Sequence, residues 1–150
     1  MDLVQQTKSV LSISAAAGVA SGATHTVAVD TLGFDAASID VSYRSINHTA
    51  APAVVAVKHS DTDGSYGAIT GIVQDTDFTV LGVANTATVN VTRFDINTRG
   101  LKRYLQVSVT PAAAAATATG NVVVVACRLG KGEAGIDSAS DAGANLRVVK

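Results

Sequence analysis

The segment Tyr104-Leu105-Gln106-Val107-Ser108-Val109-Thr110 decides the fold class, because apolar and polar side chains alternate along its whole length. Successive side chains of a β-strand point to opposite faces, so a period of two predicts a strand with one buried and one wet face. Residues 86–92 and 39–44 alternate in the same way. In all three segments the odd-numbered residues are apolar, and we expect them to face the core.

Two further runs, 53–57 and 122–126, are apolar on both faces of the strands that they would form. Such runs predict cover on both sides, either inside a two-layer fold or from a neighbouring subunit. Shorter candidates bring the expected total to about nine strands. They lie at residues 9–14, 24–30, 68–74 and 78–81.

Turn-forming residues separate several of these segments. The sequences Asp-Thr-Asp-Gly-Ser at 61–65 and Thr-Gly-Asn at 119–121 predict hairpin turns. Pro111 and the alanines at 112–116 predict one helical turn at most, or a loop, because short isolated helices are marginal. Many short strands without a βαβ rhythm favour an all-β fold, an antiparallel β-sandwich of jelly-roll-like type.

The chain is expected to form one sandwich domain, residues 1–129, in which residues 1–8 could make an N-terminal arm. From residue 130 to 150 the composition shifts to Gly, Ser and Ala, which predicts an extended C-terminal arm. This arm closes on an apolar tip, Leu146-Arg147-Val148-Val149-Lys150. Such a tip has the right form to add a strand to the exposed sheet edge of a partner, and folding back onto its own domain is the open alternative.

Composition excludes several classes of function. Ala, Val and Thr fill 64 of the 150 positions, and 11 basic against 12 acidic residues give a net charge of −1. Binding to nucleic acid needs a basic excess, so no nucleic-acid partner is expected. One Glu and no Trp leave few carboxylate pairs and aromatic platforms. The polar start and the absence of a long apolar run predict a soluble chain without an export signal and without a membrane partner.

Motifs that could bind a nucleotide or a metal ion are incomplete. Residues 130–135 match G-x-G-x-x-G, yet the helix and second strand that would hold a pyrophosphate do not follow. Asp61 with Asp63, and Asp75 with Asp77, are explained by turn chemistry, with a shared calcium site between the two loops as the open alternative. We expect no cofactor.

Nucleophile signatures are also missing, so the chain is not expected to be an enzyme. Cys127 closes an apolar run and is interpreted as a small buried hydrophobe. His25, His48 and His59 are far apart, without the spacing of metal ligands on one element, and His25 shares the parity of the core side of its strand.

One concentration of charge stands out, Arg99-Gly100-Leu101-Lys102-Arg103, directly before the strand at 104–110. It is interpreted as a solvated loop that leads into this strand. The functional alternative is a salt-bridge patch of Arg99, Lys102 and Arg103 against an acidic neighbour.

Three segments taken in order resemble a known family. They are Val57-Lys58-His59-Ser60-Asp61-Thr62-Asp63-Gly64-Ser65-Tyr66, then residues 99–107, which contain Lys102-Arg103-Tyr104-Leu105, and then residues 117–125, which end in four valines. This order is similar to the decoration, or cement, proteins of tailed-bacteriophage heads. The resemblance covers roughly residues 53–128 and lies in the order of the three segments.

The resemblance implies a jelly-roll-like virion protein on the capsid exterior, made in the host cytoplasm. Its partners would be the major capsid protein and further copies of itself, as a homo-dimer or homo-trimer, with terminal arms that reach adjacent subunits. We expect partner contacts at Arg99, Lys102, Arg103, Leu146, Arg147, Val148 and Val149.

Two alternatives belong to other classes of protein. A carbohydrate- or receptor-binding β-module of a phage tail or fibre is disfavoured because sugar faces usually stack on aromatic side chains, and only three Tyr and three Phe are present. A hydrolase on a β-scaffold is disfavoured because no catalytic signature occurs.

Overall fold

The computed structural model describes residues 7–10, 19–20, 22–44, 50–82, 88–112, 119–130 and 146–150. Within these ranges the chain forms strands and no helix, so no helix there is long and apolar enough to cross a membrane. The strands are β1 (Thr7–Val10), β2 (Val19–Ala20), β3 (His25–Asp30), β4 (Ala36–Arg44), β5 (Val54–Ser60), β6 (Gly67–Ala68), β7 (Asn90–Asn97), β8 (Tyr104–Thr110), β9 (Thr119–Gly130) and β10 (Leu146–Val149).

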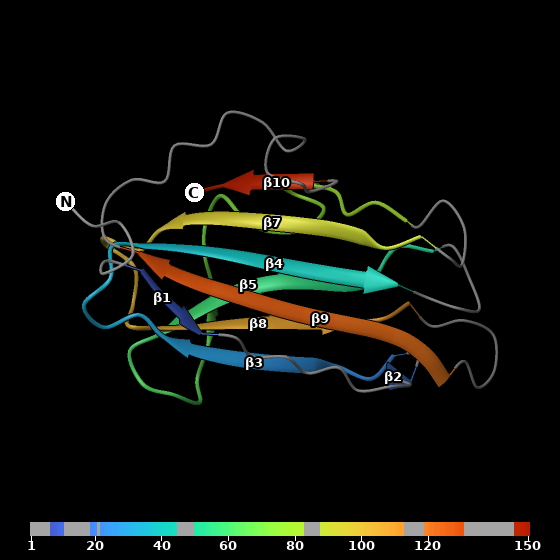
Figure 1. Cartoon of the computed structure of the whole chain (residues 1–150), viewed down its shortest axis with the longest axis horizontal. Coiled ribbons are helices and arrows are strands. Elements are labelled where there is room, and N and C mark those ends of the chain that lie inside the picture. Colours follow the sequence, from blue (N-terminus) through green and yellow to red (C-terminus); the bar gives the residue numbers. More distant parts are fainter. Residues whose placement is uncertain are drawn as a thin grey trace.

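Two sheets pack face to face. Sheet 1 has the order β1-β9-β4-β7-β10, and β2 pairs with the first residues of β9. Sheet 2 has the order β3-β8-β5-β6. Figure 1 shows β10, β7, β4 and β9 side by side in one layer, with β5, β8 and β3 in the other. Among the described strands every pairing is antiparallel except that of β10 with β7. The predicted antiparallel β-sandwich is therefore confirmed.

The antiparallel pairs are nested along the chain. β5 pairs with β6, β4 with β7, β3 with β8, and β1 with β9, from the innermost pair outward. Successive pairs alternate between the two sheets. The chain from β1 to β9 thus forms one long hairpin whose paired arms pass alternately through sheet 1 and sheet 2. Its innermost turn is the predicted hairpin turn at residues 61–65.

The core lies between the sheets and follows the period of two. β4 alternates strictly between buried and half-buried residues, and β8 buries Leu105, Val107 and Val109, as the alternation predicted. β9 contributes the odd-numbered side chains from Val123 onward. The largest fully buried side chains are Phe94, Ile39, Ile69, Ile72, Leu105, Leu129, Val41, Val55, Val57, Val107, Val109 and Val123.

The predicted orientation of residues 86–92 is wrong. β7 begins at Asn90, and its even-numbered residues face the core, whereas Val89 and Val91 do not. The reason is register: Phe94 lies opposite Ile39, so the strand turns its largest apolar side chain inward. A one-residue change of register would move that entire set to the other face. Residues 86 and 87 lie outside the described residues.

The two runs expected to be covered on both faces receive full cover on one face only. In β5, Val55 and Val57 are buried, but Val54 is exposed. In β9, Val122 and Val124 point away from the core and are half-buried. A sandwich supplies one dry side per sheet, and these small side chains are tolerated on the other.

Other predicted elements differ in extent. Residues 68–74 and 78–81 are not strands beyond Ala68, because the chain turns at Gly71, which has φ +89°, and Gln74 and Phe78 form only an isolated bridge. The turn expected at 119–121 is the start of β9, where Asn121 donates a side-chain hydrogen bond to the carbonyl of Val19 at 3.0 Å. Residues 113–118, with most of the alanine run, lie outside the described residues.

The Gln74 side chain forms hydrogen bonds with the edge of β5 where no described strand is paired with it. β6 covers only Lys58 and His59 on that edge. The Gln74 side-chain oxygen accepts a hydrogen bond from the Val55 amide at 2.5 Å, and its amide group donates to the Ala53 carbonyl at 3.4 Å. The segment around Gln74 thereby closes the sheet and leaves a shallow groove of about 270 Å³ beside β5, lined by residues such as Val54, Ala56 and Val73.

A bidentate ion pair lies on the outward face of sheet 1. Nε and Nη2 of Arg93 donate to the two Asp40 carboxylate oxygens, each at 2.6 Å. These side chains are only 14 % and 22 % exposed. Hydrogen bonding to Asp40 raises the pKa of Arg93 above its ordinary value. The pair joins β4 to β7 directly opposite each other in register.

Replacing Arg93 should destabilise the protein more than replacing an exposed arginine. Arg93→Ala leaves the Asp40 carboxylate largely out of water without its cation, so we expect a loss of about 2 kcal/mol in the free energy of unfolding. The matched control, Arg99→Ala, removes an exposed ion pair and should cost less than about 1 kcal/mol. Urea unfolding followed by circular dichroism measures both values, and equal losses would contradict a special role for the Arg93 pair.

Candidate functional site

One end of the sandwich gathers three loops, which we call the loop end: residues 31–35 after β3, residues 61–66 between β5 and β6, and residues 98–103 between β7 and β8. Backbone bonds fasten the first loop to the third. The Thr31 amide donates to the Arg103 carbonyl at 3.0 Å, and the Thr98 amide donates to the Asp35 carbonyl at 2.8 Å. The predicted basic cluster therefore lies on a loop that is held at two points.

Each cation of this cluster has an aspartate partner in its own chain. Arg99 contacts Asp35 at 3.0 Å and Lys102 contacts Asp61 at 3.1 Å. The third cation, Arg103, contacts Asp30, as described next. Asp30 ends β3, Asp35 is the last residue of the loop before β4, and Asp61 lies in the turn after β5. The cluster thus ties three loops together.

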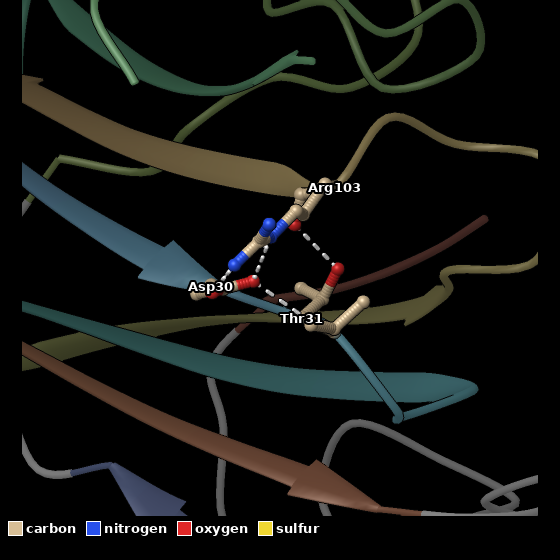
Figure 2. A network of polar contacts seen from close by, with 4 residues as sticks. Asp30, Thr31 and Arg103 are labelled. Atoms are coloured by element: carbon tan, nitrogen blue, oxygen red, sulfur yellow. Dashed lines mark hydrogen bonds and ion pairs between the residues drawn. The ribbon is translucent and has the colours of Figure 1, made fainter. Parts of the chain in front are cut away.

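The contact of Arg103 with Asp30 is the most elaborate of the three (Figure 2). Its Nε and Nη2 donate to the two carboxylate oxygens at 2.9 and 2.6 Å. The Leu32 amide donates to the same carboxylate at 3.0 Å, and the Thr31 hydroxyl donates to the Arg103 carbonyl at 2.6 Å. The Arg103 guanidinium also lies 4.9 Å from the centre of the Tyr104 ring, within the range of a cation–π contact.

Hydrogen bonding to Asp30 raises the pKa of Arg103 above its ordinary value. Arg103 and Tyr104 lie at the start of β8, and Asp30 pairs with Tyr104 in the β3–β8 ladder. The ion pair therefore joins β3 to the residue before β8 at the last pair of the β3–β8 ladder, next to the loop end. The acidic neighbour that the cluster was predicted to meet is supplied within the chain, and contact of Arg99, Lys102 and Arg103 with a separate partner stays a prediction.

Two of the three tyrosines also lie at the loop end. Tyr66 donates a hydrogen bond to Asp63 within the hairpin turn. Partial burial, followed by this hydrogen bond and the Asp63 charge, raises the pKa of Tyr66 to about 12, and Tyr104 contributes to the same shift. His59 is engaged nearby, because its Nδ1 accepts a hydrogen bond from the Lys102 amide at 3.3 Å.

The acidic pairs are used by local hydrogen bonds. Asp77 accepts from the Val73 amide at 2.7 Å, and Asp75, with φ +61°, accepts from Gln74 at 3.5 Å. Asp61 and Asp63 contact Lys102 and Tyr66 as described above. Among the described residues no three His, Cys, Asp or Glu side chains come together as a metal site. These contacts support the turn interpretation of both acidic pairs.

The predicted tip of the arm forms β10, and its end lies next to the loop end, because the Asn97 amide donates to the Lys150 carbonyl at 2.8 Å. It pairs in parallel with β7, with Leu146 opposite Thr92 and Val149 opposite Asp95. Val148 is buried and Val149 is 61 % exposed. The described tip thus folds back onto its own sheet, which was the open alternative, and is not an extended arm. Residues 131–145 lie outside the described residues, as does most of the G-x-G-x-x-G match.

Cys127 and His25 lie where their strand parity predicted. Cys127 points into the core from β9 and is 1 % exposed. Burial raises the pKa of its thiol to about 12, which disfavours the reactive thiolate. His25 begins β3 at the core edge, and its Nε2 is buried with no hydrogen-bond partner in the described part of the chain. His48 lies outside the described residues.

Sequence reasoning missed the aspartates that complete the loop end. Asp30 and Arg103 are 73 positions apart, so no local spacing connects them. The only signal was the sign of the charge at the end of a strand, which several aspartates share. Gln74 was missed because nothing in the sequence marks the edge of β5 that it closes.

Titration of Tyr66 is one test of this geometry. Its proton is held up to a pH of about 12 in the folded chain and leaves near 10 in the unfolded chain. Folding stability from this group is therefore present below pH 10 and falls as the pH rises toward 12. Absorbance titration near alkaline pH should show a late tyrosine transition that is missing in Tyr66→Phe. In Asp63→Asn it should move to lower pH, and an unchanged position in that variant would contradict the role of Asp63.

Cys127 should resist modification in the folded protein. A thiol-specific aromatic disulfide reagent should label no cysteine under native conditions and one after unfolding in urea, because burial blocks access and keeps the thiol protonated. A variant with a second cysteine at exposed Thr26 provides the control and should react at once with one equivalent. Rapid labelling of Cys127 itself in the folded chain would contradict its place in the core.

Comparison with known proteins assigns no family to the chain: no family model, no curated protein and no solved structure matches it.

Proposed function

We propose that the chain is a virion structural protein, a capsid decoration or cement protein. It binds the outer surface of an assembled phage head and stabilises the head by non-covalent bridging of neighbouring subunits of the major capsid protein. It works as a homo-oligomer and performs no chemistry. The order of the segments around residues 57–66, 99–107 and 117–125 supports this class.

The observation that carries the proposal is the outward face of sheet 2. Its side chains are small or uncharged along the centre of the sheet, and β-register places them in adjacent rows. One row runs through exposed Thr26, buried Ser108 and half-buried Ala56. The next row runs through exposed Ala28 and half-buried Gln106 and Lys58. Lys58 is the only charge in these two rows. A broad face with little charge suits contact with a regular protein surface, because few charged groups must lose water on binding.

The fold supports the proposal by its rigidity. The nested antiparallel pairs support the expected jelly-roll-like type, in which a long hairpin wraps so that both of its arms cross between two sheets. The loop-end cations are used within the chain, where they tie loops together. A body whose loops are tied together loses little conformational freedom on binding, and many such sites on one lattice act together.

A second candidate function has one observation in its favour. Tyr104 lies close enough to Tyr66 to contribute to the raised pKa of Tyr66, and Arg103 and Asp63 lie beside the two rings. Aromatic rings with flanking hydrogen-bonding groups are the parts of a carbohydrate-binding site. Saturable binding on a glycan array that Tyr104→Ala abolishes would favour a carbohydrate- or receptor-binding β-module over the capsid role.

Binding to empty heads tests the capsid role. The probe is a preparation of expanded empty heads, built from the major capsid protein of the genome that carries this chain. The wild type should bind saturably and raise the temperature at which the heads open. Ala28→Glu puts a charge on the sheet 2 face and should weaken binding about tenfold or more. Val89→Glu, which changes an exposed residue elsewhere, should bind like the wild type.

Absence of saturable binding by the wild type would overturn the proposed function. Equal binding by Ala28→Glu and Val89→Glu would overturn the assignment of the sheet 2 face. A chain without residues 131–150 tests bridging by the C-terminal segment, and unchanged occupancy and heat resistance would contradict that part of the mechanism.

A further inference from the structure

β10 is an edge strand of sheet 1, and the strand that precedes it in the chain, β9, lies three positions away in the same sheet. In sheet 1 it lies beyond β7, whereas the chain leaves the sheet at the end of β9, on the other side of β4 (Figure 1). β10 is also the only strand in a described pairing that runs parallel to its neighbour. Its place at the edge means that β7 would have an open edge if β10 left.

The connection to β10 is longer than this path requires. Gly130, Ala36 and Asn97 lie at one level across the sheet, and Leu146 lies opposite Thr92, five residues back along β7. Three strand spacings and five residue rises separate Gly130 from Leu146 by about 22 Å. The intervening residues, 131–145, can span up to about 50 Å. The connection is therefore about twice as long as the path within one molecule requires, and this excess length is available to reach a neighbouring copy.

The contacts that hold β10 are the kind that any copy of the chain can provide. The Lys150 amide donates to the Asp95 carbonyl at 2.9 Å, and the Asn97 amide donates to the Lys150 carbonyl at 2.8 Å. Val148 is the side chain of β10 shown to enter the core, whereas Val149 stays exposed. The Lys150 side chain lies over Gly71, where a Cβ would come within 3.1 Å of its Nζ.

We propose that β10 exchanges between copies of this chain, so that the β7 edge of one molecule accepts β10 of another. The bonds formed are those that exist within one molecule, so exchange costs little free energy. The connection through residues 131–145 then determines the ratio of the closed form to the exchanged form. The intramolecular pairing acts like a local concentration in the millimolar range, which keeps dilute molecules closed. Crowding of copies side by side shifts β10 onto neighbours and links them into homo-oligomers.

This exchange does not rest on the capsid role. It requires only two copies of the chain, and the test below contains no capsid. A chain that exchanges β10 but does not bind heads would overturn the proposed function alone, and a chain that binds heads without exchange would overturn the exchange alone.

Disulfide trapping between two differently tagged chains tests the proposal. One chain carries Val149→Cys and the other carries Asp95→Cys, two positions that lie opposite each other in the β10–β7 register. The folded chains are mixed at low and at high concentration, incubated and oxidised, and then separated on a non-reducing gel. The matched control replaces the second chain by Thr26→Cys, an exposed position on β3 in the other sheet.

We expect a disulfide-linked pair of the two tagged chains at about ten times the level of the Thr26→Cys control or more, rising with protein concentration. The single chain with both Val149→Cys and Asp95→Cys reports the closed form and should form an internal disulfide when dilute. Linking no stronger than in the control, together with this internal disulfide, would overturn the exchange. Failure of the internal disulfide to form would overturn the β10–β7 register on which the proposal depends.

Discussion

The structure depends on the pairing of β4 with strands on both of its edges. β4 pairs with β9 from Ala36 to Arg44 and with β7 from Ala36 to Tyr43. Both registers must turn the same side chains inward, and a shift of one residue would expose all of them. Asp40 then faces outward at the middle of the sheet, where Arg93 of β7 meets it. Core and outward ion pair therefore follow from one register.

The four ion pairs among the described residues hold parts of the molecule together. Arg93 joins two strands, and Arg99, Lys102 and Arg103 join loops at one end. The broad face of sheet 2 is left with little charge, and the end of the chain supplies an edge strand. These features support the proposed role in contacts with capsid subunits, because a face with little charge and an edge strand can both meet another protein.

The parts of the fold that could be predicted were those with local causes. Alternation at 39–44 and 104–110, the turn at 61–65 and the burial of Cys127 each follow from neighbours along the chain. The error at 86–92 had a non-local cause, since Phe94 and Ile39 had to meet across two strands. Of the candidate site, the sequence predicted the cations, which form one run, but not their aspartate partners. Those aspartates lie in three separate parts of the chain.

The sequence by itself determined that this chain is an all-β sandwich with few charged side chains, a buried thiol and an apolar C-terminal tip. Period-two patterning and composition act residue by residue, so they can be read without a fold. Only the tertiary structure decided the nesting of the strands, the aspartate that each loop-end cation meets, and the edge on which β10 lies. Those choices depend on which distant segments come together, and the local pattern is compatible with several such arrangements.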